Sequence, residues 1–137
     1  MGSGICIKDS TQQALRVLTS SKLADAMNLE TEGPKIRERY GKGDAKNYGD
    51  GAPRDNTHFL MARRLVEAGV RLVTVDLRWW DTHVKGYGTM RDGFLPRWDQ
   101  AYTALLTDLE QRGLMDSVMV VAWGEFGRSP KVNATGG

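Results

Sequence analysis

The chain has one cysteine, Cys6, among 137 residues, so it can form neither an internal disulfide nor a cysteine-based zinc site. It also lacks an excess of charge, with a formal net charge of +2, and it has no basic cluster with interleaved aromatic residues. No apolar run approaches the roughly 20 residues of a membrane-spanning helix. Residues 1–9 lack the apolar core of a signal peptide. These absences argue against a nucleic-acid-binding or membrane-spanning protein.

Motifs of two large enzyme classes are missing as well. The sequence contains no Gly-x-Ser-x-Gly elbow, so a serine hydrolase is not indicated. The glycine-rich stretch at 41–51 has no Walker pattern and does not predict a phosphate-binding loop of that type. Hydrophobic residues make up 40% and charged residues 26% of the chain, as is ordinary for a folded globular protein. The length suffices for one domain but not comfortably for two.

The strongest pattern that is present lies between residues 70 and 130. Residues 70–77 (VRLVTVDL) and 118–123 (VMVVAW) are apolar and β-branched and predict two buried strands. Between them, residues 92–112 carry apolar side chains at helical spacing, which predicts a helix that covers a sheet. Strand, helix and strand in this order form a right-handed βαβ unit. The loops after the two strands should therefore share one edge of the sheet, where ligands bind in α/β proteins.

The remaining elements are predicted to be helices joined by loops. Helices are expected over residues 11–28, 35–40 and 55–68, with Gly41–Thr57 as a loop and Gly69 as a left-handed helix terminator. On the last of these helices we expect Phe59 to face the core and Arg63 to lie elsewhere. We thus predict a single partial α/β domain over 1–137, with a helical and loop region at 10–54 and a helix plus βαβ core at 55–137. Two strands alone leave sheet edges unpaired, so another copy must supply an edge or the chain must be a piece of a larger sheet, and the missing elements favour the second.

Asp81 and His83 follow the first predicted strand directly. Two apart on an extended backbone, their side chains would point the same way, and a carboxylate beside an imidazole is a usual start for a Zn²⁺, Mn²⁺ or Fe site. Glu125, in the loop after the second strand, would add a third ligand. The alternative is an Asx-turn with a solvent-facing histidine.

Arg128 follows Glu125 by three residues. The two side chains could simply pair across a turn, or Arg128 and the backbone amides of its glycine-rich loop could bind an anion. Asp76, inside an apolar strand, must be paired, lie near the sheet edge or belong to a site. His58 is expected to be an exposed first-turn residue. Three tryptophans at the same edge are predicted to pack in the core or to wall a pocket: Trp79, Trp80 and Trp123.

Five segments, taken in order, resemble the domain-of-unknown-function family 1501. They are residues 21–29 (SKLADAMNL), 36–41 (IRERYG), 62–70 (ARRLVEAGV), 80–83 (WDTH) and 124–130 (GEFGRSP). This bacterial family is grouped with the alkaline-phosphatase-like, sulfatase-like hydrolases. The resemblance implies a three-layer α/β/α domain, divalent metals (Zn²⁺, Mn²⁺, Ca²⁺ or Mg²⁺) at the strand ends, and hydrolysis of sulfate or phosphate esters. It also implies an exported or periplasmic protein.

Carried over to this chain, the resemblance makes Asp81, His83 and Glu125 metal ligands and Arg128 an anion-binding residue. The family extends beyond this chain on both sides, where its nucleophile and an Arg-Asp-His-Trp segment would lie. We therefore expect a fragment of a metal-dependent hydrolase that is inactive alone, and the resemblance leaves the nucleophile unassigned. The alternative is a non-catalytic α/β module that forms homo-oligomers through its open sheet edges.

Overall fold

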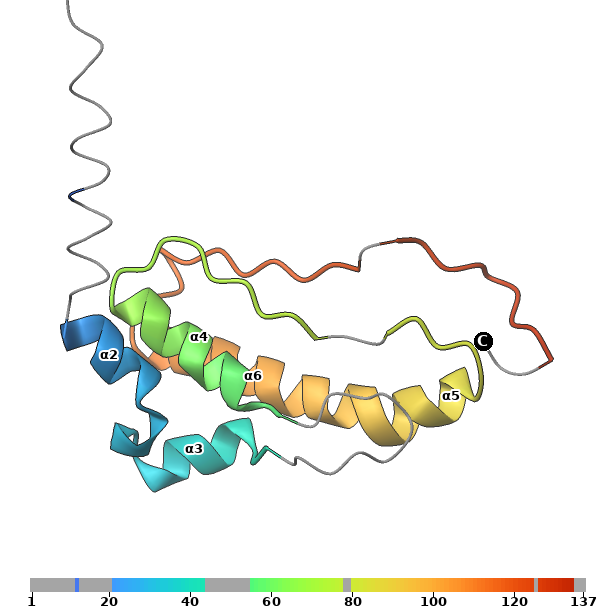
Figure 1. Cartoon of the computed structure of the whole chain (residues 1–137), viewed down its shortest axis with the longest axis horizontal. Coiled ribbons are helices and arrows are strands. Elements are labelled where there is room, and N and C mark those ends of the chain that lie inside the picture. The colour runs from blue at the N-terminus through green and yellow to red at the C-terminus, as the bar shows by residue number, and fades with distance from the viewer. Residues whose placement is uncertain (1–11, 13–20, 44–54, 78–79, 125, 135–137) are drawn as a thin grey trace, which may run out of the picture.

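The computed structural model describes residue 12 and residues 21–43, 55–77, 80–124 and 126–134, and in these ranges it is a helical protein (Figure 1). No strand occurs in these ranges. Among these residues, even the longest helix, α6, is too short and too polar to cross a membrane. In chain order the elements are α2 (Ser21–Met27), the 3-10 helix η1 (Leu29–Thr31), α3 (Pro34–Tyr40), α4 (Thr57–Glu67), α5 (Gly86–Thr89), the π-helix η2 (Met90–Phe94) and α6 (Leu95–Gln111).

Local capping rules explain where the N-terminal helices begin and end. The side chain of Asn28 accepts a hydrogen bond from the Glu30 amide at 3.2 Å and so caps η1. Pro34 occupies the first turn of α3, where its missing amide hydrogen costs nothing, and Gly41 with φ 89° ends the helix. The prediction of a helix at 35–40 is confirmed. Of the helix expected at 11–28, the described residues include α2, and most of the rest lies outside them.

Helix α4 has a clear start and stop. Asp55 Oδ1 accepts hydrogen bonds from the backbone amide and the hydroxyl of Thr57, at 2.9 and 2.6 Å. At the other end, Gly69 has φ 97° and the Val70 amide donates to the Leu65 carbonyl at 3.0 Å. Gly69 is therefore the left-handed terminator that the sequence predicts. The buried side chains of α4 include Phe59, as expected.

Elements α5, η2 and α6 form one continuous helical run, because the residues at their junctions all have right-handed helical angles. The run starts at Gly86, six residues before the predicted start at 92. Pro96 has no amide hydrogen to donate to Asp92, so the regular ladder is interrupted just after the π-turn. Gly113, with φ 66°, ends the run as predicted.

The prediction of an α/β fold with a βαβ unit is wrong for the described residues. Residues 70–77 and 118–124 run as extended segments along the same side of the helices (Figure 1), but no backbone hydrogen bond joins them among the residues described. A strand requires a partner at hydrogen-bonding distance, and an apolar, β-branched run does not supply one. The two segments are also not buried on both sides, because Leu72 and Met119 are largely exposed. The predicted three-layer arrangement is also wrong for the described residues, because its middle layer would be a sheet.

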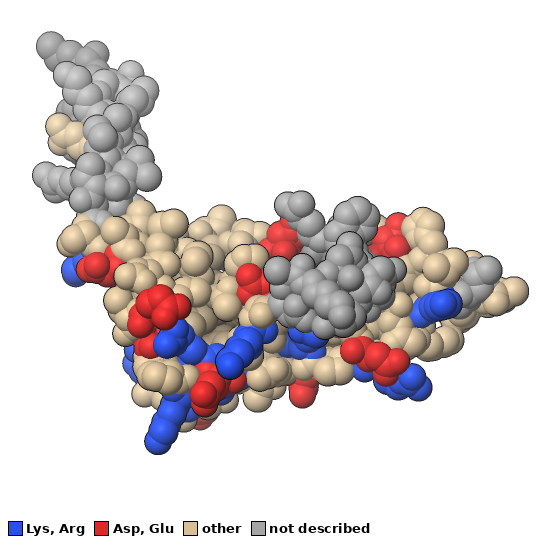
Figure 2. Space-filling model, turned by 60° about the horizontal axis from the view of Figure 1, so that its bottom comes forward, with Lys and Arg blue, Asp and Glu red and all other residues tan. Residues whose placement is uncertain are grey.

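The core lies between the helices and the extended segments. Its buried members come from α3, α4 and α6, and half-buried residues of both extended segments pack against it. The buried cluster consists of Tyr40, Phe59, Leu60, Ala101, Ala104, Leu105 and Leu109. Asn56, just before α4, links this helix to the end of α3 and the first turn of α6. Its amide nitrogen donates to the carbonyls of Tyr40 and Arg97 at 3.0 and 3.3 Å. The side of the molecule that carries α3 presents basic and acidic side chains next to one another (Figure 2).

Candidate functional site

The loops after the two extended segments meet through Arg128. Its Nη1 lies 3.3 Å from Asp81 Oδ1 and donates to the Trp80 carbonyl at 3.3 Å. Its Nη2 donates to the carbonyl and the hydroxyl of Thr82, at 3.1 and 3.4 Å. One guanidinium thus joins the residues around Asp81, which precede it in sequence by 46 to 48 positions. The sequence pattern placed these two loops together, and in this respect the structure agrees.

His83 belongs to the same cluster. Its Nδ1 lies 3.0 Å from the Asp81 carbonyl oxygen and 3.5 Å from Asp81 Oδ1. The imidazole side chain is 77% exposed and that of Asp81 is 52% exposed. When Nδ1 carries the proton and donates to the carbonyl, Nε2 is the ring atom with the lone pair that could bind a metal. The geometry also fits the alternative reading of a turn with a solvent-facing histidine, so the roles of Asp81 and His83 stay predictions.

The structure does not describe two other residues that are predicted to lie at this site. Glu125, the expected third metal ligand, lies outside the described residues, as does Trp79. Within the described ranges, no three histidine, cysteine, aspartate or glutamate side chains gather closely enough to hold a metal ion. Asp76 is exposed on its extended segment, so the problem of a buried unpaired carboxylate does not arise there.

An aromatic cluster supports the loop that carries Asp81. Trp80 packs against Phe94, the last residue of η2, with ring centroids 4.6 Å apart, and edge-on against Trp98 at 6.4 Å. Phe94 is 2% exposed. Tyr102 and Phe59 extend the cluster through Trp98. The prediction that Trp80 packs in the core is thus supported. Trp123, by contrast, is 77% exposed and does not pack in the core.

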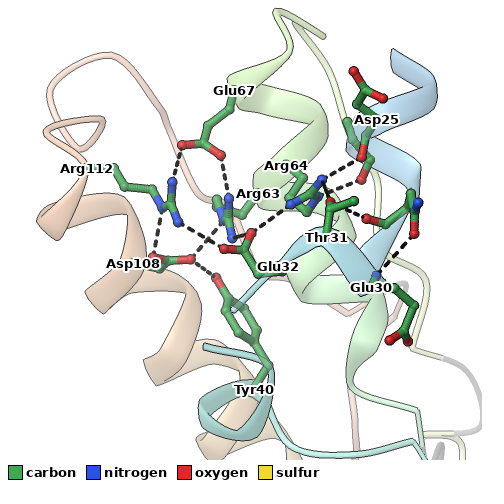
Figure 3. Close-up of polar contacts among 12 residues, drawn as sticks. Asp25, Glu30, Thr31, Glu32, Tyr40, Arg63, Arg64, Glu67, Asp108 and Arg112 are labelled. Atoms are coloured by element: carbon green, nitrogen blue, oxygen red, sulfur yellow. Dashed lines mark hydrogen bonds and ion pairs between the residues drawn. The ribbon is translucent and has the colours of Figure 1, made fainter. Parts of the chain in front are cut away.

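A buried ion network, which the sequence pattern did not reveal, lies at the other end of the helices (Figure 3). Its centre is Arg63, whose side chain is 1% exposed and contacts Glu32 and Glu67. Its Nε lies 2.8 Å from Asp108 Oδ2, close enough for an ion pair although not aligned for a hydrogen bond. The expectation that Arg63 lies away from the core was wrong. Helical periodicity alone could not find it, because two of its partners, Glu32 and Asp108, lie far away in the sequence.

Glu32 connects this network to the N-terminal helices. Its carboxylate contacts Arg63 and also lies 2.9 Å from Arg64 and 3.5 Å from Arg112. Arg64 in turn donates to the carbonyls of Asp25 and Ala26, at 2.5 and 2.9 Å. Three guanidinium groups therefore meet three carboxylates, those of Glu32, Glu67 and Asp108. The charges balance within the network, which favours a structural role over binding of an external ion.

The network also shifts the ionisation of its members. Burial acts to raise the pKa of Glu32, but the hydrogen bonds from Arg63 and Arg64 outweigh it, and the pKa lies below its usual value. Burial and the adjacent Asp108 carboxylate raise the pKa of Tyr40, whose hydroxyl donates to Asp108 Oδ2 at 3.0 Å. Tyr40 therefore stays protonated and serves as a donor over the whole physiological range.

We predict that Glu32 makes the stability of the helical part depend on pH. A carboxyl group whose pKa is lower in the folded than in the unfolded state stabilises the fold above its usual pKa, near 4.5, and loses this effect as pH falls further. Glu32→Gln should therefore lower the free energy of unfolding most at neutral pH, and the difference from the parent chain should shrink below about pH 4.5. Urea unfolding followed by circular dichroism at several pH values measures this difference.

The matched control is Glu30→Gln, which removes an exposed pair with Arg37 at 2.5 Å. Such a pair contributes at most about 1 kcal/mol, so this change should have little effect at any pH. A constant difference between Glu32→Gln and the parent chain from pH 7 to pH 3 would contradict the prediction.

Comparison with known proteins gives one family match. A family model described as "Protein of unknown function (DUF1501)" matches residues 7–137. No curated protein and no solved structure matches the chain.

Proposed function

This chain belongs to the DUF1501 family, and on that premise we propose that it carries part of the active site of a metal-dependent sulfate or phosphate ester hydrolase of the alkaline-phosphatase-like superfamily. The observation that carries the proposal is the cluster of Asp81, His83 and Arg128. It brings together a carboxylate, an imidazole and a guanidinium from two loops. The proposal depends on these residues and not on a sheet.

The types of donor atom in this cluster are suited to a divalent cation. A carboxylate oxygen and an imidazole nitrogen are ligands that Zn²⁺ and Mn²⁺ both accept. The described residues supply two ligands, Asp81 and His83, and we propose Glu125 as the third. The contact of His83 Nδ1 with the Asp81 carbonyl would orient the ring, as outer hydrogen bonds do at metal sites. A bound cation would act as a Lewis acid on an ester oxygen.

Arg128 is proposed to bind the anionic group of the ester. A guanidinium matches the geometry of sulfate and phosphate oxygens and always carries its charge. Its side chain is 45% exposed, and its contacts with the 80–82 loop are long, at 3.1 to 3.4 Å. An incoming anion can therefore compete for these donors. Asp81 would then hold both the cation and the arginine that binds the anion, which places the two next to each other.

The proposal predicts that the chain binds Mn²⁺ or Zn²⁺ through Asp81 and His83. Isothermal titration calorimetry should show that Asp81→Asn and His83→Gln each weaken binding about tenfold or more, because each removes one of the proposed ligand side chains. Affinity should also fall as pH is lowered, since only neutral imidazole binds a metal.

The chain offers a close control in its only other histidine. His58 is exposed and lies 3.9 Å from Asp55, so this pair imitates the residue types of the proposed site. His58→Gln should leave metal affinity unchanged. If the parent chain binds neither metal, or if His58→Gln weakens binding as much as His83→Gln does, the proposed ligands are wrong.

A further inference from the structure

The two extended segments have an inner and an outer side. Val75 and Leu77 of the first segment, and Val118 and Val120 of the second, pack against the helical core. In an extended backbone, alternate side chains point in opposite directions. The residues that alternate with these four along each segment therefore point away from the helices. Large apolar side chains such as Met119 are among them.

The outer side is unusually apolar for a surface. Leu72, Met119, Val121 and Trp123 are 84%, 88%, 59% and 77% exposed. Together they expose on the order of 600 Å², which approaches the ~800 Å² that each partner buries in a stable complex. This area lies at the upper end of what the largest apolar patch of a monomer usually exposes. We call these four residues the outer apolar face.

From this face we infer that the chain forms a homodimer in which the outer apolar faces of two copies pack against each other. An apolar face with little charge is self-complementary, as a two-fold interface requires. The chain's net charge of +2 opposes association only weakly. No backbone hydrogen bond among the described residues holds the 119–124 stretch, and extended backbone of this kind pairs readily with another chain.

Other kinds of partner fit this face less well. Small ligands bind in concave pockets, whereas these four side chains stand out from two extended segments. Surfaces that bind anionic lipids or nucleic acid carry several lysines and arginines, whereas the four residues of the outer apolar face are uncharged and the exposed Asp76 on the first segment is acidic. A second copy of this chain is therefore the partner that the chemistry favours. The inference does not depend on the proposed hydrolase activity.

Sedimentation velocity over a dilution series of the full chain tests the inference. The parent chain should approach a limiting mass of two chains as concentration rises. The double variant Met119→Ser and Trp123→Ser should raise the dimer dissociation constant about tenfold or more, because buried large side chains dominate such interfaces. The control is Val84→Ser with Tyr87→Ser, which removes two side chains that are 58% and 74% exposed away from this face.

The control should dimerise like the parent chain. Far-ultraviolet circular dichroism checks that each variant keeps its helices, and the single Met119→Ser variant replaces the double one if it does not. A parent chain that stays monomeric at every concentration would overturn the inference. An assembly whose mass keeps rising with concentration, without a limit at two chains, would also overturn it. So would a control variant that raises the dimer dissociation constant as much as the Met119→Ser and Trp123→Ser variant does.

Discussion

Replacing Arg63 by alanine is expected to lower the free energy of unfolding by about 3–5 kcal/mol. The substitution leaves the carboxylates of Glu32, Glu67 and Asp108 without their central partner, and the Asp108 side chain is 3% exposed. A buried charge that loses its partner cannot recover the hydration that it gave up on folding. Urea unfolding followed by helical circular dichroism measures the change.

Two further substitutions separate this effect from the loss of side-chain volume. Arg63→Lys keeps the charge, but an ammonium group cannot reach three carboxylates in the geometry of a guanidinium, so an intermediate loss is expected. Arg37→Ala removes an arginine that pairs with the exposed Glu30 and should cost at most about 1 kcal/mol. Equal losses for Arg63→Ala and Arg37→Ala would show that burial of the network contributes nothing.

Replacing Phe94 by alanine is expected to cost about 3–5 kcal/mol, the usual loss for a buried phenylalanine. Phe94 is 2% exposed and packs on Trp80, whose carbonyl accepts a hydrogen bond from Arg128. The cavity should therefore also loosen the loop that carries Asp81. Unfolding experiments give the stability, and near-ultraviolet circular dichroism reports the packing of the tryptophans.

The neighbouring residue provides the comparison for this prediction. Leu95 is 49% exposed at the start of α6, so Leu95→Ala removes a similar volume from the surface and should cost clearly less. Phe94→Leu, which keeps most of the volume, should recover much of the stability. If Phe94→Ala leaves the near-ultraviolet signal of the parent chain unchanged, then Phe94 does not position Trp80.

Much of the local structure could be predicted from the residues. Gly69 and Gly113 end helices as expected, because only glycine takes a positive φ there without strain. The apolar runs of the two extended segments predict burial, and Val75, Leu77, Val118 and Val120 do pack against the core, although Leu72 and Met119 of the same runs are exposed. The meeting of Arg128 with Asp81 also follows the predicted placement of their loops. Whether these residues bind a metal and an anion stays a prediction.

The sequence by itself determined the helices at 34–40 and 57–67 and the helix ends at Gly69 and Gly113, because these depend on neighbours within a few residues. Only the tertiary structure decided two other features. The segments at 70–77 and 118–124 are not strands in the described structure, since a strand needs hydrogen bonds from another segment. Arg63 is buried because Glu32, 31 residues away in the chain, and Asp108 come together around it. Such distant partners leave no periodic signal in a sequence.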